Sequence, residues 1–223
     1  VSWVSEFRGL LSSCFMLAGM WLFYKTKSEN KFNGISQVIV LLLGLMAMLS
    51  KPVAIIYPVL LLLIDYFVLK QFLRKNFYYY LILAACLIPF AVFTSNLQPT
   101  VTHEMQYPVW LRFLLPFFCL AFYMFKLFIP VSFCATYGYT PISLENSFLL
   151  LASTLLFSLL VIYYCYKRRR ENRMLVFAVL FFMMGFLPVS GLLTFYFQQF
   201  SNVADRYLYL SLIGVALLIA TEI

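Results

Sequence analysis

Two basic residues stand at the edges of long uncharged stretches of this chain. Lys51 follows an apolar run and precedes Pro52, and Arg206 follows the uncharged residues 174–204 and Asp205. Lysine carries a compact point charge and arginine a planar fork of donors, and both can neutralise a phosphate on which negative charge develops. We therefore predict that Lys51 and Arg206 bind a phosphate group. The alternative is that both are anchors whose long side chains reach lipid headgroups.

Four further residues could support these two: Asp205, Tyr207, Glu6 and Arg8. Asp205 could orient the guanidinium of Arg206, compensate its charge, or cap the start of the next helix. Asp65 is predicted to be structural, because it falls near the far end of an apolar run.

A second set of candidates falls between apolar runs: His103, Glu104, Tyr137 and Tyr139. Together they could line a groove for a sugar or an acceptor, and Glu104 or His103 could act as a general base. A single histidine without a second His or Cys nearby is a poor metal site, so we predict no metal-binding residues, while a need for a divalent metal in the reaction stays open. The five cysteines are scattered without a CxxC pair and are interpreted as packing residues.

The elements that position these residues must be membrane helices. Hydrophobic residues make up 64% of the chain and charged residues only 11%, against roughly a quarter charged in soluble domains. Lipid cannot satisfy backbone polar groups, so only helices or closed barrels can cross it. The apolar runs are unbroken rather than alternating, which excludes barrel strands. We predict an all-α membrane protein.

The spans follow from the uncharged runs. We expect about seven full crossings plus one re-entrant or interfacial segment, each crossing needing roughly 17–25 residues. The apolar runs are Gly9–Tyr24, Ile35–Leu49, Pro52–Leu69, Phe77–Thr94, Val109–Ile129, Phe148–Tyr166, Met174–Leu193 and Tyr207–Thr221.

Three basic clusters separate these runs and predict their orientation. They are Lys25, Lys27 and Lys31; Lys70, Arg74 and Lys75; and Lys167, Arg168, Arg169, Arg170 and Arg173. Clusters of this kind favour cytoplasmic loops rather than nucleic-acid binding. All three can be cytoplasmic only if one of the three runs between the second and third clusters does not cross. We predict that the run that does not cross is Val109–Ile129, because it contains Arg112, Pro116 and Lys126. An ordinary crossing with an external basic loop is the alternative.

Three motifs occur in order along the chain. The first is the stretch from Val1 to Ser12, similar to a VAWVSERKDLLS pattern from which it departs at Phe7 and Gly9. The second is Ser50-Lys51-Pro52-Val53-Ala54, continuing to Asp65-Tyr66. The third is Phe186-Leu187-Pro188-Val189, then Phe197-Gln198-Gln199-Phe200-Ser201 and Val203-Ala204-Asp205-Arg206-Tyr207-Leu208-Tyr209-Leu210. The chain thereby resembles multi-spanning glycosyltransferases of the GT-C fold, nearest to the transmembrane and tetratricopeptide-repeat protein O-mannosyltransferases and their bacterial relatives.

The resemblance implies a single transmembrane glycosyltransferase domain over residues 1–223. It implies a polyprenyl-phosphate-linked hexose, mannose above all, as donor, and a protein or glycan hydroxyl as acceptor. It also implies an active site on the non-cytoplasmic face of a bacterial inner membrane or the endoplasmic reticulum. The catalytic residue would lie upstream of Val1, because the family carries it in an earlier outer loop, and we expect this chain to be a fragment. Two alternatives remain open: a transporter or flippase of polyprenyl-linked glycans, and a non-catalytic scaffold of the same fold.

Overall fold

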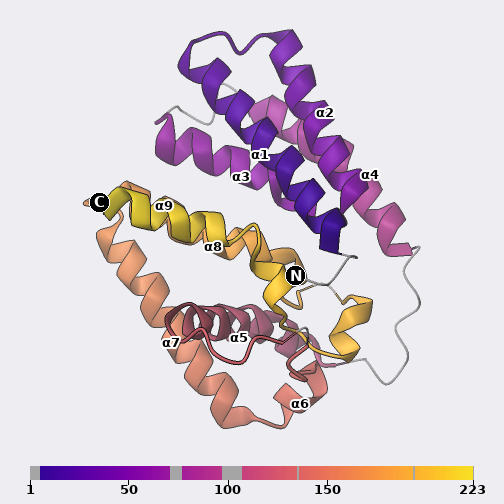
Figure 1. Ribbon diagram of the computed structural model, residues 1–223, viewed down its shortest axis with the longest axis vertical. Helices are drawn as coiled ribbons and strands as arrows, with labels where there is room; N and C mark the ends of the chain where they lie inside the picture. Colours follow the sequence, from indigo (N-terminus) through magenta and orange to yellow (C-terminus); the bar gives the residue numbers. More distant parts are fainter. Residues whose placement is uncertain (1–5, 71–76, 97–106, 135, 193, 223) are drawn as a thin grey trace. The chain divides into compact units, whose positions relative to one another are not determined.

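In the part of the chain that the computed structural model describes, all regular secondary structure is helical (Figure 1). The described residues are 6–70, 77–96, 107–134, 136–192 and 194–222. The chain divides into two compact units, Val1–Leu97 and Gln98–Ile223. The all-α prediction is confirmed, whereas the single transmembrane domain and the GT-C type remain predictions.

The first unit is built around a hairpin of two helices. Its elements are α1 (Phe7–Ser28), α2 (Gly34–Ser50), the 3-10 helix η2 (Pro52–Ile56), α3 (Tyr57–Leu63), the π-helix η3 (Ile64–Val68) and α4 (Phe77–Asn96). Asn33 begins α2, since its side chain accepts a hydrogen bond from the Ser36 amide at 3.0 Å. Pro52 ends α2, because a proline disfavours helical backbone at the preceding residue, and Lys51 is extended (φ −155°, ψ 130°).

The hairpin closes around one buried aromatic ring. Tyr57 has no exposed surface, and its hydroxyl donates to the Val40 carbonyl at 3.2 Å. The ring fits because Gly19 on α1 and Gly44 on α2 carry no side chain. A Cβ on Gly44 would lie 2.7 Å from ring carbons, and one on Gly19 would overlap the hydroxyl. Small residues on α1 and α2 thus make room for the ring that enters from α3.

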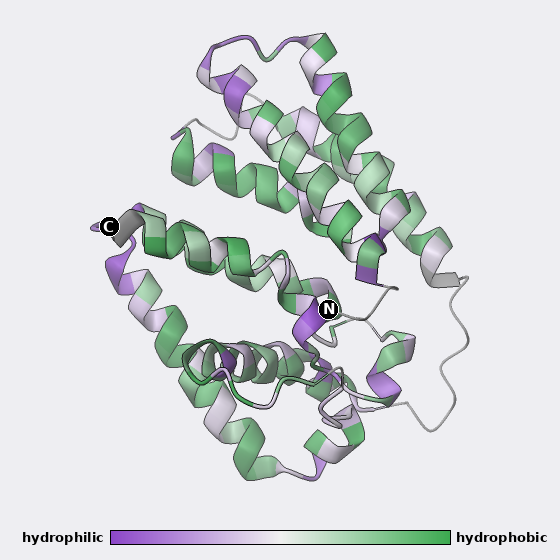
Figure 2. Cartoon of the chain, in the orientation of Figure 1, coloured by the Kyte–Doolittle hydropathy of each residue, from purple (hydrophilic) through white to green (hydrophobic). Residues whose placement is uncertain are grey.

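The second unit has longer connections between its helices. Its elements are α5 (Val109–Phe128), α6 (Pro141–Glu145), α7 (Phe148–Arg168), α8 (Arg173–Phe186), the 3-10 helices η6 (Leu187–Val189), η7 (Tyr196–Gln199) and η8 (Asp205–Leu208), and α9 (Leu212–Glu222). Its core joins α5, α8 and η8 through residues such as Leu111, Leu115, Tyr123, Phe186 and Val203. Figure 2 shows hydrophobic residues along most of α7 and α9, with hydrophilic residues gathered at helix ends and turns.

Within the described residues, four helices are long and apolar enough to cross a membrane: Phe7–Ser28, Phe77–Thr94, Val109–Phe128 and Phe148–Arg168. The same part of the chain has three shorter apolar helical segments: Gly34–Ser50, Pro52–Val68 and Arg173–Val189. The 17 residues of α2 rise only about 25 Å, less than the roughly 30 Å of a hydrocarbon core. Three of these four helices are among the seven predicted crossings, and the fourth, Val109–Phe128, is the run predicted not to cross. The count of about seven crossings stays a prediction.

The last two predicted spans are less regular than their apolar sequence suggests. The α-helix of the run Met174–Leu193 ends at Phe186 and continues only as η6, because Pro188 lacks an amide donor and Gly191 takes a left-handed φ of 105°. In the run Tyr207–Thr221 the α-helix begins only at Leu212. Hydropathy did not reveal these interruptions, because the residues concerned are themselves apolar.

The run Val109–Ile129 forms one continuous 20-residue helix that passes through Pro116. Its length and hydropathy suffice for a crossing, so a re-entrant or interfacial arrangement remains a prediction without support from the helix itself. Lys126 of this run is buried, and its ammonium donates to the Val131 carbonyl at 2.6 Å and the Ser132 carbonyl at 3.1 Å.

Candidate functional site

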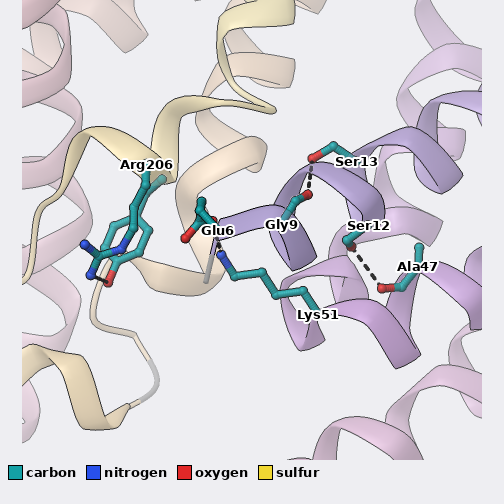
Figure 3. A network of polar contacts seen from close by, with 8 residues as sticks. Glu6, Gly9, Ser12, Ser13, Ala47, Lys51 and Arg206 are labelled. Carbon is teal, nitrogen blue, oxygen red and sulfur yellow. Dashed lines mark hydrogen bonds and ion pairs between the residues drawn. The ribbon is translucent and has the colours of Figure 1, made fainter. Parts of the chain in front are cut away.

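The first candidate cation, Lys51, occupies the break between α2 and η2. Its extended backbone turns the chain out of α2, and its side chain reaches Glu6 at the start of α1 (Figure 3). The ammonium nitrogen lies 2.5 Å from Glu6 Oε1. The Glu6 side chain is 7% exposed, whereas that of Lys51 is 27% exposed. A lysine in this position has a fixed counterion on one side and accessible surface on another.

Gly9 makes room for this ion pair. A Cβ at Gly9 would overlap the Glu6 carboxylate and lie 3.1 Å from the Lys51 ammonium. Gly9, where the chain departs from the VAWVSERKDLLS pattern, thus leaves the space in which Glu6 and Lys51 meet. The same turn of α1 is held by Ser12, which donates to the Ala47 carbonyl of α2 at 2.9 Å (Figure 3). Arg8, predicted as a supporting residue, has an exposed side chain on this turn.

The second candidate cation, Arg206, lies in η8 of the second unit. Its guanidinium carbon is 5.0 Å from the ring centroids of both Phe197 and Tyr207, and Nη2 donates to the Tyr207 hydroxyl at 3.3 Å. Stacking on aromatic faces holds a guanidinium plane in one orientation. Tyr207, predicted as supporting, therefore contacts Arg206 directly.

Asp205 makes its side-chain bonds to a distant loop. Its Oδ1 accepts from the Tyr137 hydroxyl at 2.7 Å and its Oδ2 accepts from the Cys134 amide at 3.0 Å. Ala204, rather than Asp205, is the residue that caps the start of η8, without a side-chain bond. A role of Asp205 in orienting or compensating Arg206 stays a prediction. The carboxylate ties η8 to the loop before α6. Burial, followed by the bond to Asp205, raises the pKa of Tyr137 to about 12.

Lys126 completes this cluster and was missed as a site residue. Its ammonium lies 4.6 Å from the ring centroid of Tyr137, besides its bonds to the loop carbonyls. The sequence signal that could have identified Lys126 was its position as a lysine inside an apolar run. Tyr139, by contrast, packs its ring edge-to-face against Phe118 and Phe122 and is partly exposed. Of the predicted acceptor groove, Tyr137 and Tyr139 are therefore engaged in loop packing, and His103 and Glu104 lie outside the described residues.

A buried polar network lies within the second unit beneath η7 and η8. Gln198 donates to Asn202 Oδ1 at 2.7 Å, and Asn202 donates to the Ser190 carbonyl at 3.0 Å. Tyr107 adds its hydroxyl, which donates to Gln198 Oε1 at 3.2 Å. Buried polar groups must be satisfied, and a satisfied network fixes one arrangement of the chain. The sequence signal was a pair of amide residues four apart in an uncharged stretch, and of the two only Gln198 falls within a motif.

Asp65 is structural, as its position predicts, but its partners were not foreseen. Its carboxylate has no exposed surface and lies 2.5 Å from the ammonium of Lys27 and 2.7 Å from the hydroxyl of Tyr80. The Lys27 ammonium also lies 5.0 Å from the ring centroid of Phe23 and 5.8 Å from that of Phe32. Lys27, assigned by sequence to a cytoplasmic basic loop, is in fact buried inside the first unit.

The predicted site residues thus fall into two sets. Lys51 and Glu6 meet in the first unit, while Asp205, Arg206, Tyr207 and Tyr137 cluster in the second. Over the described part of the chain, no group of three or more His, Cys, Asp or Glu residues could hold a metal ion. Comparison with protein-family models, curated proteins and solved structures found no match. The resemblance to GT-C enzymes accordingly rests on the sequence motifs.

Proposed function

We propose that this chain is part of a membrane glycosyltransferase of GT-C type. It would move a hexose, with mannose as first candidate, from a polyprenyl-phosphate carrier to a hydroxyl of a protein or glycan. The observation that carries the proposal is the geometry of Lys51: a partly exposed ammonium, placed by a helix break and held by the buried carboxylate of Glu6. Ionisable residues kept at such positions in a membrane protein mark sites of function.

Lys51 is the residue that we expect to bind the phosphate of the donor. An ammonium has three N–H donors, and one of them points to Glu6, so a phosphate oxygen can approach from the accessible side. In the transfer, the bond between the sugar's anomeric carbon and the phosphate oxygen breaks, and that carbon bonds to the acceptor oxygen. The phosphate leaves with its negative charge, which Lys51 would stabilise. The acceptor proton passes to a base that the resemblance places upstream of Val1.

Arg206 is the second proposed phosphate ligand. Its guanidinium lies beside the rings of Phe197 and Tyr207, and its planar fork of donors suits bidentate binding of phosphate oxygens. Asp205 would act on the loop that carries Tyr137 rather than on the phosphate. The proposed location is a bacterial inner membrane or the endoplasmic reticulum, with the reaction on the non-cytoplasmic face.

The test uses the full-length protein in native-like membranes with a polyprenyl-phosphate hexose as donor. Arg206→Ala should lower turnover by about two orders of magnitude, on the scale of removing one charge-stabilising donor, and Arg206→Lys should restore only part of it. Lys51→Arg should retain more activity than Lys51→Met. Lys31→Gln, which removes an exposed basic side chain elsewhere, is the matched control and should leave turnover unchanged. Near wild-type activity of well-inserted Arg206→Ala and Lys51→Met, or turnover of a nucleotide sugar without lipid carrier, would overturn the proposal.

A transporter or flippase of polyprenyl-linked glycans is the second candidate. Discontinuous helices are typical of transporter binding sites, and the chain has two apolar runs interrupted near a proline, at Lys51 and at Leu187–Val189. The same membranes distinguish the two: a flippase moves the labelled lipid-linked sugar between leaflets without transferring the hexose. A chain that does neither would be a scaffold of the same fold.

A further inference from the structure

The turn between α7 and α8 carries a dense group of exposed charges. Between positions 167 and 173 five basic residues stand against one acidic residue, a formal net charge of +4. All six side chains are exposed: Lys167, Arg168, Arg169, Arg170, Glu171 and Arg173. Arg168 pairs with Glu171. The turn therefore presents far more positive charge than its single acid can neutralise.

Aromatic rings lie directly beside these charges. Tyr163, Tyr164 and Tyr166 are each more than half exposed on the last turns of α7. The Arg169 guanidinium lies 3.8 Å from the ring centroid of Tyr166, and that of Arg168 lies 5.9 Å from Tyr164. A guanidinium stacked on a ring keeps its N–H edge available to acceptors, and exposed tyrosines are enriched at the membrane–water interface.

The helix below this turn fits a lipid environment. Its 21 residues rise about 31 Å, close to the thickness of the hydrocarbon core. Among the four helices of spanning length, α7 has the highest mean hydropathy, 2.2. Only 11% of its most apolar stretch of 18 residues is buried, the smallest fraction of the four. The length and exposed apolar surface of α7 are compatible with a position in lipid, which would place its C-terminal Tyr and Arg residues at the depth of the headgroups.

We propose that this α7–α8 turn, residues 163–173, is a binding site for the headgroups of anionic phospholipids. Arginines bind phosphate oxygens through paired donors, and a basic cluster beside a membrane helix attracts acidic lipids. The uncompensated charge selects anionic over zwitterionic headgroups, because both carry a phosphate but only the former keep a net negative charge. The inference depends on α7 lying in a membrane and not on the proposed transferase activity.

The test compares lipid association in bilayers. The purified full-length protein is reconstituted in phosphatidylcholine containing a trace of spin-labelled phosphatidylglycerol or spin-labelled phosphatidylcholine, and the immobilised fraction of each is measured by electron spin resonance. Wild type should select phosphatidylglycerol several-fold. The variant Lys167→Gln/Arg169→Gln/Arg170→Gln should lose most of this selectivity.

The matched control is Lys25→Gln/Lys31→Gln/Lys70→Gln, which removes three exposed basic residues from the first unit. It should keep most of the selectivity, with both triple variants showing the thermal stability of wild type. Three outcomes would overturn the proposal: equal association of both lipids with wild type, unchanged selectivity in the α7–α8 variant, or an equal loss in the control.

Discussion

The basic clusters after α1 and after α7 look alike in sequence and differ in structure. At the end of α1, Lys27 is turned inward onto Asp65, which also accepts from Tyr80, and the following Lys31 pairs with Glu29 at 2.9 Å. After α7, the basic side chains remain exposed and stack on tyrosines. A count of positive charges therefore predicts which loops are basic, but not which charges are available to lipid or ligand.

Buried and exposed ion pairs also differ in how much they contribute to the free energy of unfolding. A buried ion pair removes two charges from water, so loss of one partner leaves the other unsatisfied in a medium that cannot solvate it. An exposed pair keeps its water and contributes little to stability. The predictions below test this contrast between Lys27–Asp65 and Arg168–Glu171, from the largest expected effect to the smallest.

Removing the buried carboxylate should have the largest effect. Asp65→Ala strands the Lys27 ammonium inside the first unit and should lower the free energy of unfolding by about 3–5 kcal/mol. Unfolding of the detergent-solubilised protein by increasing mole fractions of SDS measures this. The double variant Lys27→Met/Asp65→Leu removes both charges and should recover most of the loss. If the double variant is as unstable as Asp65→Ala, an unpaired charge is not the cause.

Removing the third member of the buried group should have an intermediate effect. Tyr80→Phe deletes the hydroxyl that donates to Asp65 at 2.7 Å, and bonds to charged groups contribute about 1.5–3 kcal/mol. Tyr79→Phe is the control, because the neighbouring hydroxyl donates to the uncharged Gln37 carbonyl at 3.1 Å and should matter less. Equal losses in the same SDS titration would mean that the charge on Asp65 does not strengthen its bond to Tyr80.

The second unit offers a less buried carboxylate–tyrosine pair for comparison, Asp205 with Tyr137. Because the folded protein raises the pKa of Tyr137 from 10.0 to about 12, the unfolded chain loses this proton first as pH rises. The stabilising contribution of Tyr137 is thus present below pH 10 and is lost between pH 10 and about 12. Asp205→Asn should lower the pKa only in part, since burial is the larger cause.

Difference absorbance near the tyrosinate band, with Tyr137→Phe subtracted, follows this titration directly. A Tyr137 pKa that is unchanged in Asp205→Asn would mean that the carboxylate has no part in the shift.

The smallest effect is expected at the exposed pair. Glu171→Gln breaks the contact with Arg168 on a solvated turn and should leave stability unchanged within error. The same substitution increases the net positive charge of the α7–α8 turn and should strengthen its preference for anionic lipid. A marked loss of stability would show that the turn is held together by the pair, and the contrast with Lys27–Asp65 would then fail.

Part of the candidate site was accessible to sequence reasoning. Lys51 and Arg206 were identified from their places at the ends of uncharged runs, and both are held by specific partners. Their partners were harder to predict. Glu6 lies 45 residues from Lys51, and Tyr137 lies 68 residues from Asp205. Such pairs depend on which helices become neighbours, and hydrophobic periodicity does not specify that.

The sequence by itself determined the helical class, the apolar character of the helices and several of their ends. These properties are local: lipid-compatible runs must form helices, Asn33 and Asn172 cap the helices that follow them, and Pro52 ends α2. Only the tertiary structure decided that Lys27 and Lys126 are buried and that the α-helix after Arg206 begins at Leu212. A charge becomes buried when distant residues surround it with a counterion, carbonyls or aromatic rings, and those neighbours are brought together by packing rather than by adjacency along the chain.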